Sequence, residues 1–341
     1  RLDSKETAGS VVWKESSGAI AGRVVAKFTK LALGSAPTDE EQIPKIQSID
    51  DKQWSDIPAV DLSIDDFTLF GSRLGSLRLI GANTERGSIW NIDNLEIKNP
   101  HSTLSANGQW RLSGDAKGIK LKAELAIADL GKLSSFMGYP DKVKAGKGNV
   151  KADMEWLNFP WAFSYETMAG TADVDMKEGI FVHVNSRSAR LLELLSLQSL
   201  QRILSFNFRP GNEFQNGFPW ESISGKFVID RGVAKTDDLT ITSPVASILL
   251  AGDSDLTRKT WNMNADVKPK FDMSGSAVAT GFLVNPLVGV SALLTQYLLR
   301  NPIERAMTAK YHVRGPWDDP TLIPLDIPVP KPQGLTSEPG G

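Results

Sequence analysis

Apolar and polar residues alternate along most of this chain. Between Leu104 and Leu112 the even-numbered residues are apolar or glycine and the odd-numbered residues are polar. The same two-residue period runs through 119–127, 150–156, 261–267 and 307–313. This period is typical of a β-strand with one apolar and one polar face. We therefore predict roughly a dozen strands, mostly antiparallel and joined by short turns.

A short motif occurs twice at matching spacing. Segment 94–97 is Asn-Leu-Glu-Ile and segment 238–241 is Asp-Leu-Thr-Ile, and each is followed by a proline, an aliphatic residue and a glycine at the same intervals. Another alternating run follows each copy. The repeat predicts a small β-meander that is used twice.

Two stretches depart from the alternation. Residues 186–205 place leucine and isoleucine in a broad stripe between charged residues, which predicts an amphipathic helix, either packed on the sheet or lying as a lid at an interface. Residues 273–299 contain no charged residue, a length that reaches the roughly 20 residues of a membrane span. Because Asn285-Pro286 interrupts this stretch, we expect a hairpin of two short buried helices.

These elements divide the chain into segments. Arg1 is preceded by no initiator methionine or apolar signal core, so we expect any anchor to lie upstream in a longer chain. The expected segments are N-terminal strands continuing from that upstream part (1–56), a first β-meander (57–185), an amphipathic helical insert (186–220), a second meander repeat (221–272), a charge-free apolar helical segment (273–302), a closing strand (303–320) and a Pro/Gly-rich tail that is a linker or disordered end (321–341).

Candidate chemistry is sparse. The 38 basic and 40 acidic residues are interspersed, so no nucleic-acid partner is expected, and the absence of cysteine excludes thiolate chemistry. No nucleophile elbow or phosphate-binding loop occurs. The histidines lack ligand spacing, and the paired aspartates are expected at turns, where their side chains cap the backbone. These residues are His101, His183 and His312, and Asp50-Asp51, Asp65-Asp66, Asp237-Asp238 and Asp318-Asp319. We predict no catalytic residues, no metal site, no cofactor and no enzymatic activity.

The apolar face of so long a sheet has to be covered. A second sheet would give a closed β-sandwich, and a curled sheet would line a channel for acyl chains. A membrane barrel is disfavoured because the tryptophans are expected along the strands and not in girdles. The predicted lining residues are Leu104, Trp110, Leu112, Ile119, Leu121, Leu125, Met154, Trp156, Trp261, Met263 and Val267.

Several motifs stand out beside the alternation. They are the leucine-rich run at 191–200, Gly217-Phe218-Pro219, Gly225-Lys226-Phe227, the Asp238-Leu239 repeat, the closing segment 311–320, and Leu62-Ser63-Ile64-Asp65-Asp66-Phe67 upstream. Together they resemble the C-terminal part of the YhdP family of AsmA-like proteins. The resemblance covers roughly residues 57 to 320.

The resemblance implies part of a very large Gram-negative envelope protein, anchored in the inner membrane and reaching through the periplasm toward the outer membrane. It implies a mainly β fold, a long curved and twisted antiparallel sheet with an apolar groove that carries phospholipid. The membrane surfaces, and envelope proteins at the groove ends, would be further partners. The alternative is an envelope scaffold or assembly factor with a closed sandwich core. The residues expected to meet a membrane or close the groove are Leu191, Leu195, Leu200, Phe282, Leu283, Leu287 and Leu294.

Overall fold

The structure is a computed structural model of the whole chain. It describes residues 2–3, 7–15, 22–34, 57–85, 88–113, 117–138, 140, 142–157, 160, 164–182, 218–244, 246–270, 308–317 and 319–325.

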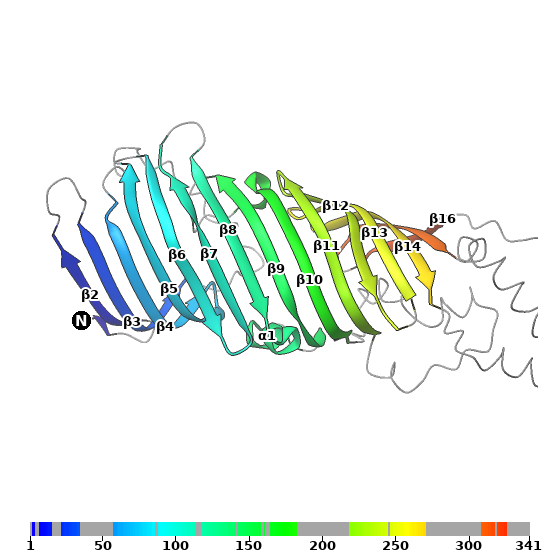
Figure 1. Cartoon of the computed structure of the whole chain (residues 1–341), viewed down its shortest axis with the longest axis horizontal. Coiled ribbons are helices and arrows are strands. Elements are labelled where there is room, and N and C mark those ends of the chain that lie inside the picture. Colours follow the sequence, from blue (N-terminus) through cyan, green and yellow to red (C-terminus); the bar gives the residue numbers. More distant parts are fainter. Residues whose placement is uncertain are drawn as a thin grey trace, which may run out of the picture.

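Sixteen strands form one open sheet in which every strand pairs with the strand before and after it in the chain. Figure 1 shows them side by side along the long axis of the molecule. The strands are β1 Leu2–Asp3, β2 Thr7–Lys14, β3 Arg23–Leu33, β4 Ala59–Leu69, β5 Ser72–Glu85, β6 Ile89–Asn99, β7 Ser102–Arg111, β8 Gly118–Ile127, β9 Val143–Leu157, β10 Ala169–Phe181, β11 Phe218–Asp230, β12 Val233–Thr242, β13 Ala246–Asp255, β14 Thr260–Pro269, β15 Ala309–Pro316 and β16 Thr321–Leu325. The predicted long, mainly antiparallel sheet is confirmed, and all described strands belong to one sheet, whereas a sandwich requires two.

Most neighbouring strands are joined by tight turns because the turn residues adopt the required backbone angles. Phe70-Gly71 and Arg231-Gly232 all have positive φ, which matches the right-handed twist of the two strands that each turn joins. One pair departs from this scheme, since β3 and β4 are parallel. A parallel pair needs a long crossover, and residues 35–56 connect these two strands.

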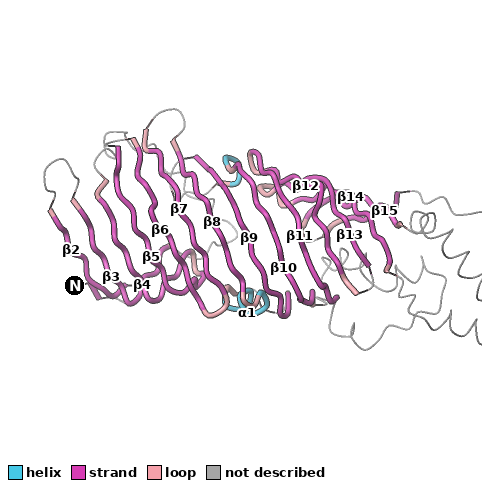
Figure 2. The backbone as a smooth tube through the Cα atoms, in the orientation of Figure 1, coloured by secondary structure: helices cyan, strands magenta, loops and turns pink. Residues whose placement is uncertain are grey.

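The ends of the strands form two long sides of the sheet, visible in Figure 2. We call these sides the α1 edge and the η2 edge, and they are distinct from the outermost strands β1 and β16. The α1 edge is where β6, β8, β10, β12 and β14 end, and it carries the helix α1 (Leu130–Phe136). The η2 edge is the opposite one, where the short helix η2 (Tyr165–Thr167) follows β9. Among the helices that the structure describes, none is long and apolar enough to cross a membrane.

The sequence repeat coincides with a repeated pair of strands. Strand β13 lies as many residues after β7 as Asp238 lies after Asn94, so the two strands occupy equivalent places in the two copies. Each preceding strand carries a register shift at the equivalent place, between Ile92 and Leu95 in β6 and between Thr236 and Leu239 in β12. The repeated unit is therefore a hairpin with a bulge in its first strand.

The paired aspartates that the structure describes in full lie at these irregularities and not at turns, so the expectation of turns is wrong for them. Asp65-Asp66 lies within β4 where the register shifts, and Asp237-Asp238 lies at the bulge of β12. The bulge interrupts the ladder, and Asp238 Oδ1 accepts a hydrogen bond from the Lys226 backbone N–H at 2.8 Å. Asp50, Asp51 and Asp318 lie outside the described residues.

Two segments differ from the expected divisions. The segment 321–341, expected as a linker or disordered end, begins with the edge strand β16, whose Pro324 is compatible with an edge position. Strand β11 begins at Phe218, inside the segment expected as a helical insert.

Candidate functional site

One face of the sheet carries apolar side chains from strand to strand. Leu121 lies opposite Gly108 on one side and Met154 on the other. The same row continues through the next strands to Trp261 on β14. Its members after Met154 are Gly170, Ile229, Ala234, Ser254, Trp261 and Gly315. The strand pairing thus places the predicted lining residues on one face, which we call the apolar face.

The apolar face has small side chains along its midline. Ala106, Ala123, Ala152 and Ala172 are direct cross-strand partners on β7 to β10. Larger residues flank them toward both edges, such as Leu121 and Leu125 on β8. On these four strands the midline of the apolar face is therefore lined by small side chains.

Burial differs along the apolar face. On β8 the two end residues Ile119 and Ile127 are buried, while Leu121, Ala123 and Leu125 between them are half-buried. Across the set predicted as lining, the structure gives two groups. Trp110, Leu112, Ile119, Met263 and Val267 are buried, and Leu104, Leu121, Leu125, Met154, Trp156 and Trp261 are half-buried.

The α1 edge is packed by a cluster of large apolar residues. It follows a cross-strand row that includes Ile127, Met176, Ile248 and Val267, and Leu133 of α1 packs onto it. Asp129 caps α1 by accepting a hydrogen bond from the Lys132 backbone N–H at 2.9 Å. The pKa of the Asp129 carboxyl is held below its ordinary value, mainly by this hydrogen bond.

The η2 edge is lined by tryptophans, which corrects the expectation that they are spread along the strands. Trp90 and Trp110 are direct partners, and Trp156 lies in the same row beyond Ile119. Trp261 and Trp317 lie further along the edge with ring centroids 5.7 Å apart. The indoles gather there because they sit at strand ends, a position that periodicity alone does not reveal.

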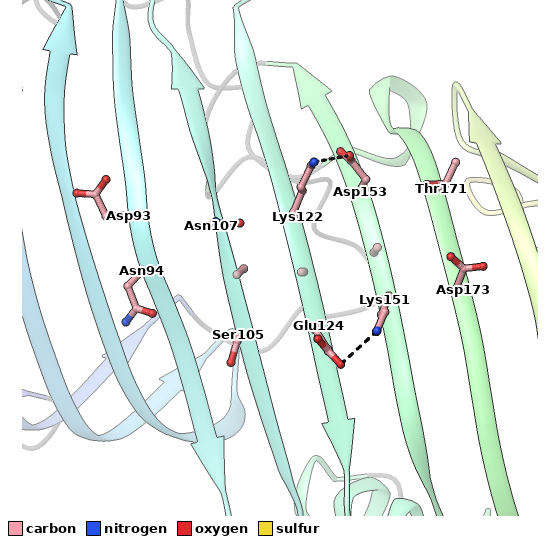
Figure 3. A pocket seen from close by; sticks show the side chains of 13 residues that line it. Asp93, Asn94, Ser105, Asn107, Lys122, Glu124, Lys151, Asp153, Thr171 and Asp173 are labelled. Atoms are coloured by element: carbon pink, nitrogen blue, oxygen red, sulfur yellow. Dashed lines mark ion pairs between the residues drawn. The ribbon is translucent and has the colours of Figure 1, made fainter.

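The opposite face of the sheet is polar and carries a shallow depression over β6 to β10 (Figure 3). Its cross-strand ion pairs include Lys122 with Asp153 at 3.9 Å and Lys151 with Glu124 at 3.8 Å. Such exposed pairs contribute roughly 0–1 kcal/mol each. Their main effect is a solvated face of mixed charge.

Few titratable or metal-binding side chains lie close together in the part of the chain that the structure describes. In the described part of the chain no group of three or more His, Cys, Asp or Glu residues is placed to hold a metal ion. His312 Nδ1 lies 2.9 Å from Asn264 Oδ1, and the His101 ring contacts Phe136 edge-on. Burial raises the pKa of the Tyr311 hydroxyl on the apolar face. His183 and the residues expected to meet a membrane lie outside the described residues.

The periodicity missed apolar-face residues on strands with bulges. Across the β6–β7 pair, Ile92 lies opposite Gly108 and Leu95 lies opposite Ala106. Strict alternation would place Ile92 and Leu95 on opposite faces, because an odd number of positions separates them. The register shift between them brings both onto one face. The signal that marks this place is the Asp93-Asn94 pair, which recurs as Asp237-Asp238 in the second copy of the repeat.

A long open sheet with one apolar face and one solvated face defines an elongated β-sheet protein. The comparison with protein families identifies which one: the model of the YhdP family, described as YhdP protein, matches residues 1–322. The chain belongs to this family. The match includes the first 56 residues, beyond the motifs that suggested the resemblance.

One curated relative is the protein of Escherichia coli (strain K12) named "Intermembrane phospholipid transporter YhdP". It is 28% identical to this chain over 286 residues. The alignment covers 84% of this chain and 22% of the relative, so the chain corresponds to about a fifth of that protein. No solved structure matches this chain.

Proposed function

We propose that this chain carries phospholipid between the inner and outer membranes of a Gram-negative envelope, without catalysing a reaction, and thereby supports the outer-membrane barrier. The acyl chains would lie in a groove along the apolar face. The observation that supports this best is the apolar face, whose residues are half-buried along β8 to β10. The relative's name gives the cargo class, and membership of the YhdP family links it to this chain.

The physical basis is the burial of methylene groups. Each buried methylene contributes about 0.8 kcal/mol, so a row of apolar side chains holds an acyl chain without specific polar contacts. Adjacent strands lie about 4.8 Å apart, so a lipid that leaves the apolar residues of one strand meets those of the next at that spacing. A lipid can therefore move along the sheet from one set of apolar contacts to a similar one.

The proposed setting is the periplasm, within an inner-membrane-anchored protein that reaches toward the outer membrane. Membrane surfaces, and envelope proteins at the ends of the sheet, are the proposed partners.

The charge-free segment is the proposed membrane contact. Deletion of 276–299 should abolish binding to phospholipid vesicles, and unchanged binding would reject this part of the proposal.

The test is native mass spectrometry of the purified chain with analysis of extracted lipid. We expect phospholipid with the unaltered chain and none with the double variant Leu121→Asp, Trp261→Asp. The reason is that an acyl chain covering a carboxylate would remove it from water, which costs free energy. The matched control is Gln109→Asp, Lys268→Asp, which places carboxylates at exposed positions of β7 and β14. Circular dichroism checks that all variants fold. A chain that retains no phospholipid, or a folded double variant that retains it fully, would reject the proposal.

A further inference from the structure

The tryptophans are distributed unequally between the two edges. Of the nine in the chain, the structure describes seven. Trp220 alone among these lies at the α1 edge, where it is buried against Gly179 and Phe181. The others lie at the η2 edge. They are Trp13, Trp90, Trp110, Trp156, Trp261 and Trp317.

These indoles lie at a boundary between apolar and polar surroundings. On β9 the apolar-face residues from midline to edge are Ala152, Met154 and Trp156, and on β14 they are Ala265, Met263 and Trp261. An indole has an apolar ring and one N–H donor, which favours a place where apolar matter meets a hydrogen-bonding layer.

The hydrogen bonds of the indoles differ along this edge. Trp90 Nε1 donates to the Pro58 carbonyl at 3.0 Å, and Trp317 Nε1 donates to Ser254 Oγ at 2.9 Å. Trp261 Nε1 is buried and has no hydrogen-bond partner among the residues that the structure describes. Trp220 Nε1 at the α1 edge is likewise buried without a partner in the described part of the chain, so the two edges differ in the number of indoles and not in this property.

Exposed basic residues lie in two turns at the η2 edge. Arg231 is in the turn between β11 and β12, and Arg258 is in the turn between β13 and β14, with side chains 84% and 82% exposed. Each also contacts a carboxylate, Arg231 with Asp230 at 3.8 Å and Arg258 with Asp255 at 3.3 Å. From the midline outward along β14, the order is thus aliphatic side chains, an indole and then, in the turn, the paired guanidinium of Arg258 and carboxylate of Asp255.

A phospholipid has the same order of groups: acyl chains, ester carbonyls and then phosphate. We infer that the η2 edge is where the glycerol and phosphate of a bound phospholipid lie, with the acyl chains directed across the midline toward the α1 edge. This inference rests on the proposed function and adds the orientation of the lipid across the sheet.

The experiment uses the whole chain with vesicles of phosphatidylethanolamine and phosphatidylglycerol that contain a photoactivatable phospholipid. One probe carries a diazirine next to the headgroup and the other at the end of an acyl chain. We expect the headgroup probe to label the η2 edge around Trp156, Trp261 and Arg258. The acyl-end probe should label half-buried residues between the midline and the α1 edge, such as Leu125 and Val150.

The outcomes separate this inference from the proposed function. Headgroup labelling at the α1 edge overturns the orientation while the proposed function survives. Absence of labelling on the apolar face by either probe rejects both.

Discussion

Strands β8 and β14 carry nearly the same alternating pattern and differ in how their apolar residues are covered. The middle of β8, at Leu121, Ala123 and Leu125, is half-buried. The middle of β14 is closed, since Met263 is 2% exposed and Ala265 is 0% exposed. Alternation therefore predicts which face a residue occupies, but not whether that face is filled or accessible.

The packing around the two strands explains the difference. Met263 and Ala265 belong to a cluster with Val313 of β15, against which Tyr311 and Leu322 pack. The partners of Ala123 on both sides are the small Ala106 and Ala152, which cover little of it. The region around β14 thus resembles a protein core, and the region around β8 is the better candidate for contact with a ligand.

The largest expected effect comes from a charge in the closed region. Ala265→Asp buries a carboxylate without a partner, and we expect it to cost about 4 kcal/mol or more, enough to unfold this part of the sheet. Thermal unfolding followed by circular dichroism measures this, with Lys268→Asp on the polar face of the same strand as control. A normally folded Ala265→Asp would show that β14 is as accessible as β8.

The matching change in the accessible region should affect lipid more than folding. Leu121→Asp is expected to cost about 1–2 kcal/mol in stability and to reduce phospholipid retention at least about tenfold. Lipid extraction and thermal unfolding of the same preparation give both quantities. Unfolding as severe as that of Ala265→Asp would place Leu121 in a closed core.

A smaller effect is expected at the helix that covers the α1 edge. Asp129→Ala removes the cap of α1 and should cost about 1 kcal/mol at neutral pH. Because the folded-state pKa of Asp129 is lowered, its stabilisation is present above the unfolded-state value and is lost as pH falls through the folded-state value. The difference between variant and unaltered chain should therefore shrink in acid. A difference in unfolding midpoint that is constant down to the lowest pH would contradict this account.

The smallest effects are expected on the polar face. Lys122→Gln and Lys151→Gln each remove an exposed ion pair and should change stability by no more than about 0.5 kcal/mol. Phospholipid retention should stay the same, because these side chains point away from the apolar face. Loss of lipid in either variant would show that the depression in Figure 3, and not the apolar face, contacts the ligand.

The sequence by itself determined the fold class, the membership of most residues in one of two faces, and the repeated hairpin. These properties are local, since alternation and turn residues act within one or two strands. The motifs also sufficed for the family, including the Asp238-Leu239 repeat and the closing segment 311–320.

The tertiary structure alone decided how accessible each part of the apolar face is. Bulges place Ile92 and Leu95 on the same face, and strand order makes four alanines partners along the midline. The tertiary structure also places tryptophans from separate strands together at the η2 edge and makes β3 and β4 parallel. These features depend on which strands are neighbours and in what register, and a shift of one residue would turn every side chain to the other face. Periodicity within a strand contains no information about that register.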